Sequence, residues 1–456
     1  MDRVKRWTLI ATIMGSSVAF IDGSVVSVAL PAIQRDLGGG LAAQQWIVDA
    51  YLLTLGSLIL VGGALADVFG EVRMFTLGVA AFGVASALCA AAPDSTSLIA
   101  FRAVQGLAGA LLTPASLAVL TATFSGAERG AAIGTWTAWS GIATVIGPLL
   151  GGWLIEVSSW RMIFLINVPI AAATVLLVLA KVPRRGPTRT DARVDYGGAA
   201  LCAAGLAALV FGFIEQPRRG WGDAAVQASL AAGVVLLACF VLYEARTDAP
   251  MLPLRLFARR NFAVTNVETF AVYGGLSAFG FFLTLFLQQL AGYSPFQAGL
   301  AQLPVTIMLF ALSRYVGRLS ARYGPRAFMA AGPLLAGASV FLLTRLPIDL
   351  DYWTDLLPPL LGFALGLSLT VAPLTTTVLG EAGAGDAGIA SGVNNAVARV
   401  AGLVAIAAVG IAAAGVTDHL SPHGFHRAVA IVALLLGLGG AVGAAGIRNP
   451  EAAART

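Results

Sequence analysis

The first apolar run of the chain is Trp7–Leu30, WTLIATIMGSSVAFIDGSVVSVAL, and its one charged residue is Asp22. A helix needs about 20 mostly apolar residues to cross the ~30 Å hydrocarbon layer of a bilayer, so this run is long enough to span it. It is also longer than the apolar segment of a cleavable signal peptide. The sequence therefore predicts a transmembrane helix here that is retained in the mature protein.

The composition of the whole chain agrees with that of its first run. Of 456 residues, 58% are hydrophobic and 11% are charged, whereas a soluble protein has about 25% charged residues. The mean hydropathy is +0.85. These values exclude a soluble enzyme, a disordered chain and a disulfide scaffold, and they leave a polytopic membrane protein. No phosphate-binding loop is evident in the sequence, so we expect no direct use of ATP.

The basic residues do not form the surface that a nucleic acid requires. The net charge is +5, but Lys and Arg lie in short clusters between apolar runs rather than on one face. The three cysteines lie inside apolar runs, without the spacing of a metal site. For His419, His423 and His426 a solvated loop is a simpler interpretation than a weak metal site. We therefore expect the lipid bilayer as a partner, and neither nucleic acid nor a metal.

Fourteen apolar runs follow one another along the chain. They are continuous and rich in Ala, Leu and Gly rather than alternating, which predicts helices and not strands. The predicted spans are 7–30, 46–66, 74–92, 97–120, 130–153, 162–181, 196–215, 225–244, 262–290, 298–319, 327–345, 356–379, 388–414 and 427–446.

The distribution of Lys and Arg predicts the orientation of these spans. Most of them fall in alternate loops, which places those loops and both termini in the cytoplasm. An odd number of spans would destroy this sorting. Arg102 and Arg399 are assigned to neither side, because they fall within predicted helices. We expect a multi-pass protein of the cell membrane.

A weak internal repeat predicts the domain organisation. The segment 63–70 after the second span resembles 317–324 after the tenth. Repeated halves are typical of secondary transporters, in which the binding site lies where the halves meet. The predicted parts are a six-helix half at 1–181, a cytoplasmic linker at 182–195, two inserted helices at 196–244, a second linker at 245–261, a second six-helix half at 262–446 and a cytoplasmic tail at 447–456.

Six short motifs stand in order along these spans. They are Asp22 with Ala29-Leu30-Pro31, the inner loop 63–73, Arg102-Ala-Val-Gln105-Gly106, Gly147-Pro148-Leu-Leu-Gly151-Gly152, Trp160-Arg161 with Asn167, and Gly292-Tyr293-Ser294-Pro295. In this order the chain resembles the major facilitator superfamily, specifically its fourteen-helix drug:proton antiporter branch. The resemblance covers nearly the whole chain. It implies an all-α membrane protein with the major facilitator fold, which moves its substrate by alternating access.

The resemblance implies that the inner loop is a gate that holds the outward-open state through a charge network. In place of the family's usual basic residues this loop has Val68, Glu71 and Val72, so we expect the network to be weaker here. A plain helix cap is the alternative role for Asp67. The expected gate residues are Gly63, Asp67, Gly70 and Arg73.

The fifth span carries the glycine and proline pattern associated with antiporters. Glycines let helices approach closely, and Pro148 removes a helical hydrogen bond and bends the axis. The resemblance implies that this bend helps to close the cavity, and an ordinary tight helix contact is the alternative. The residues concerned are Gly134, Gly147, Pro148, Gly151 and Gly152.

Charged residues within the spans carry the mechanistic prediction. A charge in hydrocarbon costs at least about 2.5–3.5 kcal/mol, so such residues normally face a cavity or a partner. Desolvation favours the protonated form of a carboxyl. We expect Asp22 and Glu268 to bind protons and substrate charge, with Arg102 as the coupling residue. The alternatives are a static Asp22–Arg102 pair and a structural Glu268.

Other polar and aromatic side chains at suitable depths are candidates for the cavity wall. Packing is the alternative for the aromatic residues, and a surface position is the alternative for Asp49. Arg399 is expected to pair with a helix C-terminus. The candidates are Phe20, Asp49, Gln105, Trp136, Trp139, Phe270, Tyr273, Gln288, Asn394 and Asn395.

These features predict a proton-coupled antiporter that exports hydrophobic, cationic drugs or related small molecules. It is not an enzyme, it needs no cofactor beyond the proton gradient, and it is expected to be a monomer. The alternatives are a dedicated exporter of one endogenous metabolite or self-made antibiotic, and a transport-incompetent membrane receptor. Intramembrane charges argue against the receptor. A channel is disfavoured because no filter-like loop or ring of charges is evident in the sequence.

Overall fold

The computed structural model describes residues 2–183, 194–381, 387–414 and 420–449, which are almost entirely helical. Fourteen helical segments in this part of the chain are long and apolar enough to cross a membrane, as predicted. The same residues contain no β-strand beyond an isolated bridge between Ala414 and Leu420. The prediction of an all-α membrane protein is confirmed.

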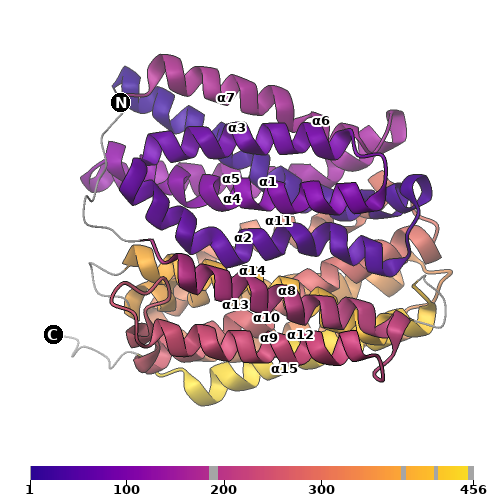
Figure 1. The fold of residues 1–456 in the computed structure, drawn as a ribbon. Helices are drawn as coiled ribbons and strands as arrows, with labels where there is room; N and C mark the ends of the chain where they lie inside the picture. The colour runs from indigo at the N-terminus through magenta and orange to yellow at the C-terminus, as the bar shows by residue number, and fades with distance from the viewer. Residues whose placement is uncertain (1, 184–193, 382–386, 415–419, 450–456) are drawn as a thin grey trace. The chain divides into compact units, whose positions relative to one another are not determined.

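The chain divides into two compact units, and unit 1 comprises Met1–Met251 and Tyr293–Leu300. Its helices are α1 (Arg3–Leu37), α2 (Leu41–Phe69), α3 (Glu71–Ala90), α4 (Ser95–Thr123), α5 (Gly126–Val157), α6 (Met162–Leu165), α7 (Asn167–Lys181), α8 (Tyr196–Arg219) and α9 (Ala224–Glu244). Within this unit α1 packs against α5 and α7, and α4 packs against both α2 and α3. The inserted pair, α8 and α9, joins the unit through contacts of α8 with α2 (Figure 1).

Unit 2 comprises Leu252–Gly292 and Ala301–Thr456. Its elements are η1 (Leu254–Ala258), α10 (Arg260–Leu285), η2 (Phe286–Leu290), most of α11 (Pro295–Tyr323), α12 (Arg326–Leu342), η3 (Leu343–Arg345), η4 (Tyr352–Leu356), α13 (Leu357–Glu381), α14 (Ala387–Ala413) and α15 (Pro422–Gly446). Within it α10 packs against α14 and α15, and α12 packs against α13 and α15.

Several helices extend beyond the apolar runs that predicted them. The span predicted at 7–30 is the middle of α1, which begins at Arg3 and continues through Pro31 to Leu37. The span predicted at 298–319 begins one turn earlier, at Pro295. Residues 184–193 of the predicted linker, residues 450–456 of the predicted tail and His419 lie outside the described residues.

The helix ends follow local chemistry. Asp94 forms a capping box with Ser97 at the start of α4, which satisfies a free backbone N–H there. Gly70 stands between α2 and α3 with φ +93°, a conformation that side chains with a Cβ rarely adopt. We expect the glycines of the inner loop, Gly63 and Gly70, to permit a tight turn; the turn is found at Gly70, whereas Gly63 lies within α2.

Helices α2 and α4 pack closely because glycines stand at their crossing points. A Cβ on Gly62 would collide with the backbone oxygen of Ala110, and one on Gly106 would collide with that of Tyr51. Thr54 Oγ1 donates a hydrogen bond to Ala103 O at 2.8 Å across the same interface. Small residues that allow backbone approach are the usual means of helix packing in membranes.

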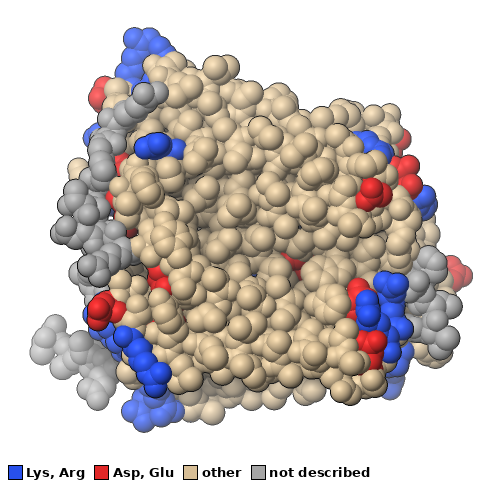
Figure 2. Space-filling view, viewed as in Figure 1, with Lys and Arg blue, Asp and Glu red and all other residues tan. Residues whose placement is uncertain are grey.

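The surface of each unit matches a lipid environment. In Figure 2 most charged side chains lie near the ends of the helices, and the surface along the helices is largely uncharged. Many large apolar side chains are exposed there, for example Leu176, Val234 and Leu434. Such exposure is expected where lipid and not water is the solvent.

We expect Gly62→Ala to lower the thermal stability of the detergent-solubilised protein, because the added Cβ meets rigid backbone of α4. The matched control is Gly437→Ala on α15, where a Cβ would meet nothing within 4 Å. That change should be neutral or stabilising by up to about 1 kcal/mol, because Ala favours the helix. Equal effects of the two substitutions would contradict the importance of this close approach.

Candidate functional site

Asp22 of α1 and Arg102 of α4 form a buried ion pair in the interior of unit 1. The Arg102 Nη1 atom lies 2.5 Å from Asp22 Oδ2. Both side chains are almost completely buried. The structure thus brings together two of the three predicted coupling residues.

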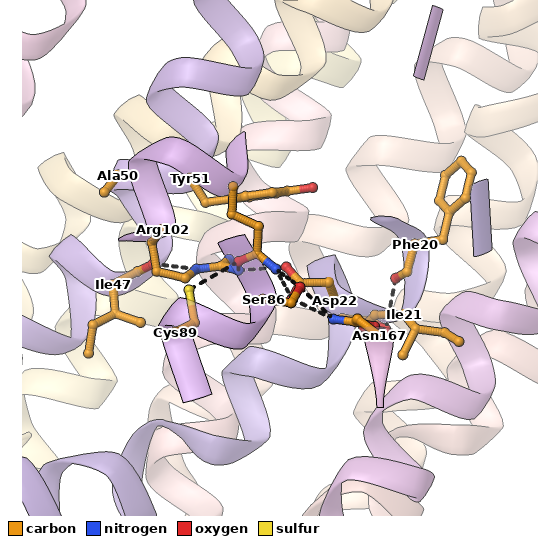
Figure 3. Close-up of polar contacts among 12 residues, drawn as sticks. Phe20, Ile21, Asp22, Ile47, Ala50, Tyr51, Ser86, Cys89, Arg102 and Asn167 are labelled. Carbon is orange, nitrogen blue, oxygen red and sulfur yellow. Dashed lines mark hydrogen bonds and ion pairs between the residues drawn. The ribbon is translucent and has the colours of Figure 1, made fainter. Parts of the chain in front are cut away.

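Three further side chains complete the environment of the Asp22 carboxylate (Figure 3). Gln105 Nε2 donates to Asp22 Oδ1 at 2.9 Å, and Asn167 Nδ2 of α7 donates to the same oxygen at 3.3 Å. Ser86 Oγ of α3 accepts from both amides, at 2.8 Å and 3.3 Å. We call Asp22, Ser86, Arg102, Gln105 and Asn167 the Asp22 network. It links α1, α3, α4 and α7.

The guanidinium of Arg102 has partners on several sides. Its Nε donates to Ile47 O of α2 at 3.1 Å, and its Nη1 also donates to Gln105 Oε1 at 2.5 Å. The Tyr51 ring lies 4.3 Å from the guanidinium carbon, a cation–π distance. Gly106, one turn further along α4, allows α2 to come close enough for these contacts. Hydrogen bonds and a counter-ion together offset the cost of burying this charge.

Asn167 Oδ1 is a buried acceptor without a hydrogen-bond partner among the described residues. It belongs to the amide whose nitrogen donates to Asp22. A flip of this amide would turn Oδ1 toward Asp22, and a proton on the carboxyl would then be its donor.

Glu268, the third predicted coupling residue, stands on α10 of unit 2. It is fully buried, and neither carboxylate oxygen has a hydrogen-bond partner among the described residues. Its Oε2 lies 2.8 Å from where a Cβ on Gly443 of α15 would stand, and Met329 O of α12 borders the same point. Glu268 therefore sits among α10, α12 and α15 of unit 2.

Asp49 of α2 is a second buried carboxyl without hydrogen-bond partners among the described residues. Trp46, one turn earlier, packs against Phe211 of α8 at a ring distance of 6.5 Å. A surface position for Asp49 is excluded by its complete burial. Its predicted place in a cavity wall stays a prediction.

The glycine face of α5 contacts two different helices. Gly147 and Gly151 lie against Ser24 and Val25 of α1, so closely that an added Cβ would collide with them. A Cβ on Gly152 would instead lie 2.6 Å from Phe296 Cα in the first turn of α11. These three glycines make close helix contacts, whereas a Cβ on Gly134 would meet nothing within 4 Å.

The first turn of α11 is fixed to α5 within unit 1. Glu156 Oε1 accepts a hydrogen bond from Phe296 N at 3.1 Å. A Cβ on Gly299 would lie 2.9 Å from Pro148 O, so α11 also packs against the predicted bend. The motif around Pro148 therefore forms an interhelical contact.

The remaining gate and cavity candidates lie in varied surroundings. A Cβ on Gly63 would lie 3.7 Å from Pro114, Asp67 is partly exposed, and Arg73 is exposed without an ion pair among the described residues.

Trp136 Nε1 donates to Ser16 Oγ at 2.9 Å, and its ring packs edge-on against Phe20. Candidates that are exposed or partly exposed are Trp139, Phe270, Tyr273, Gln288, Asn394 and Asn395.

Sequence reasoning missed Ser86 and the site role of Asn167. Both are single polar residues in otherwise apolar runs, a signal that could have identified them. No group of three or more His, Cys, Asp or Glu side chains in the described part of the chain could hold a metal ion.

Comparison with known proteins gives extensive matches. A family profile described as Major Facilitator Superfamily matches residues 12–406. The puromycin resistance protein of Streptomyces alboniger is 36% identical over 439 residues, covering 94% of this chain and 86% of its own length. A multidrug resistance protein of Mycobacterium tuberculosis is 36% identical over 438 residues, covering 94% and 80%. The methylenomycin A resistance protein of Streptomyces coelicolor is 33% identical over 446 residues, covering 97% and 92%.

Solved structures match the fold at lower identity. A crystal structure of a peptide transporter in complex with sulfate has a TM-score of 0.72 and 14% identity, covering 98% of this chain and 94% of that chain. The expected major facilitator fold is confirmed.

We expect Arg102→Gln to lower the free energy of unfolding by about 3–5 kcal/mol, because it leaves the Asp22 charge buried without a counter-ion. The double variant Asp22→Asn/Arg102→Gln should regain much of this loss. Thermal unfolding of the purified protein in detergent measures both changes.

The control for the Arg102 series is Lys5→Gln. It breaks the Lys5–Glu128 ion pair, in which both side chains are accessible to solvent, and it should change stability much less. A double variant no more stable than Arg102→Gln would show that the two buried charges do not depend on each other.

Proposed function

Since this chain belongs to the Major Facilitator Superfamily, we propose that it is a member of the fourteen-helix drug:proton antiporter branch and exports hydrophobic small molecules in exchange for protons. It is a multi-pass membrane transporter and not an enzyme. The proton gradient is its proposed energy source, the cell membrane its location, and the cytoplasm the side of both termini. The names of its relatives, which include resistance and export proteins, support export as the direction of transport.

The observation that carries the proton-coupling proposal is the Asp22 network. Asp22 is the acidic partner of Arg102 inside unit 1, so protonation of Asp22 removes the counter-ion of a buried guanidinium. An unpaired buried charge is unfavourable, and the network must then rearrange or recruit another anion or water. After a flip of its amide, Asn167 would accept a hydrogen bond from the added proton through Oδ1. A proton can thereby change which conformation of unit 1 is favoured.

Glu268 is proposed as a second proton-binding group. Its carboxyl is buried without a hydrogen-bond partner or cation among the described residues, so protonation breaks no contact of the ionised form. Desolvation favours a neutral carboxyl. A conformational change that admits water between α10, α12 and α15 would permit release of this proton.

The course of α11 supports alternating access. Its residues 295–300 belong to unit 1, and residues 301–323 belong to unit 2. Pro304 stands just beyond this boundary and has no N–H for Leu300 O, four residues earlier. We propose that α11 bends here when the units rock, with its first turn held by Glu156 and the α5 glycines.

The breadth of the substrate range is a separate question. The alternative, a dedicated exporter of one metabolite or self-made antibiotic, is favoured by relatives whose names refer to single antibiotics. A multidrug exporter is favoured by the mycobacterial relative. Both use the same proton chemistry in this proposal. The receptor alternative is disfavoured because a protein that transports nothing has no need of a buried charge pair such as Asp22–Arg102.

We expect proteoliposomes with an imposed pH gradient to move at least one of three probes, the cation ethidium, the neutral dye Nile red and the acid 9-anthracenecarboxylate. Asp22→Asn should reduce gradient-driven movement at least about tenfold, because the titrating carboxyl is lost. The matched control is Glu128→Gln on the same unit, which should retain transport. Undiminished, equally proton-dependent transport by Asp22→Asn would remove Asp22 from the mechanism.

For Glu268→Gln we expect unchanged or higher thermal stability, because the amide is a neutral isostere at a site without a cation. Fewer protons should move per substrate, measured with a pH-sensitive dye inside the vesicles. The control is Asn266→Ser. It changes a buried amide of the same helix that packs toward α14, and it should leave the number of protons per substrate unchanged. Lower stability with an unaltered proton ratio would assign Glu268 a structural role.

A further inference from the structure

Helices α10 and α14 of unit 2 are joined by a polar contact within the membrane span. Asn394 Nδ2 donates to Thr269 Oγ1 at 2.8 Å and to Asn266 Oδ1 at 3.2 Å. Tyr273, one turn beyond Thr269, continues this stripe of α10 and is partly exposed. Polar groups of two adjacent helices therefore gather along one interface.

Arg399 lies at the middle of α14, five residues beyond Asn394. It is about 18 Å from Ala387 and about 21 Å from Ala413 along the helix. Its side chain is partly exposed, and it stands close to the level of Tyr273, because a Cβ on Gly274 of α10 would lie 3.2 Å from Ala401 O of α14. Asn395, one turn earlier on the same face of α14, is exposed.

The guanidinium of Arg399 has no ion pair or hydrogen bond with any described residue. The expected pairing with a helix C-terminus is thus not found among the described residues. Arg102 provides the contrast, since it is fully buried and bonded to Asp22, Gln105 and Ile47 O. Of these two arginines at membrane depth, Arg102 is buried and paired, whereas Arg399 is partly exposed and has no ion pair among the described residues.

The acidic residues of unit 2 do not compensate Arg399. Among its described spans, Glu268 is the one carboxyl away from the helix ends. Glu268 is buried toward Gly443 of α15 and Met329 of α12, whereas Tyr273 and Arg399 stand at the level where α10 packs against α14. A partly exposed, uncompensated cation at this depth is expensive against lipid tails, so it is expected to face water or a ligand.

We propose that Arg399 and Tyr273 bind the acidic group of a hydrophobic substrate, a carboxylate or an ionised phenol. A guanidinium presents several N–H donors that match such an anion, and a tyrosine hydroxyl can donate one more hydrogen bond. Phe270, one turn before Tyr273 and exposed, supplies an apolar surface for an aromatic substrate. This inference rests on the proposed export function and specifies the substrate class.

The inference reverses the charge that the sequence led us to expect for the substrate. The sequence predicts a cationic substrate because Asp22 and Glu268 are its candidates for pairing with substrate charge. In the structure Asp22 is neutralised by Arg102, and Glu268 is enclosed by helices. The partly exposed charge among the predicted intramembrane residues is instead the positive one, Arg399.

The test uses 9-anthracenecarboxylate and its methyl ester, which differ in the charged group alone. Binding to the full-length protein in detergent at pH 8 is measured by energy transfer from tryptophan to the probe. We expect the wild type to bind the acid at least about tenfold more tightly than Arg399→Gln does, with ester binding unchanged. Arg399→Lys should retain part of the acid affinity, and Tyr273→Phe should lose a smaller part.

The control is Arg345→Gln, which removes an exposed arginine at the end of η3 and should leave the affinity for both probes unchanged. Failure of the acid to bind the wild type, or equal acid binding by wild type and Arg399→Gln, would overturn the proposal. Misfolding of both Arg399 variants in size-exclusion chromatography would also overturn it, since Arg399 would then be structural.

The two proposals can fail separately. Gradient-driven movement of ethidium without binding of the acid would retain proton-coupled export and reject the acidic-substrate site. Arg399-dependent binding of the acid without gradient-driven movement of any probe would retain the site and reject proton-coupled export.

Discussion

The free energy of a charge in a medium without water is the constraint on which this molecule depends. Arg102 can exist at the centre of unit 1 because Asp22, Gln105 and the backbone oxygen of Ile47 replace the water that it has lost. The same contacts tie α4 to α1 and α2. The Asp22–Arg102 pair therefore holds these helices together while Asp22 is ionised. Protonation of Asp22 would weaken the same pair, so a structural role and a proposed proton-responsive role belong to one contact.

Two carboxyls and one arginine within the spans have no partner in the described part of the chain that would offset the cost of their charge. Glu268 and Asp49 are buried without hydrogen-bond partners among the described residues, a costly arrangement for the ionised form. Arg399 is partly exposed without a counter-ion in the described part of the chain. Local violations of polar satisfaction are typical of functional sites, and these residues are the ones proposed above for proton binding and for substrate charge.

Close approach of helix backbones is the second physical constraint, and it positions both the buried ion pair and the proposed hinge. Glycines let α2 approach α4 so that Arg102 reaches Ile47 O, and they let α5 hold the first turn of α11. Because α11 belongs to one unit at its first turn and to the other beyond it, Pro304 lies where a bend is least costly. Packing glycines and one proline thus position both the ion pair and the proposed hinge.

The sequence by itself determined the class of protein, the fourteen spans and most charges within them, because length, hydropathy and charge are properties of single segments. Asp22 and Arg102 could be selected as membrane-depth charges in the same way. Which charge meets which partner was decided by the tertiary structure alone. These helices are apolar on most sides, so periodicity does not fix their rotation, and contacts such as those of Asn167 with Asp22, or Glu268 with α15, depend on helix packing.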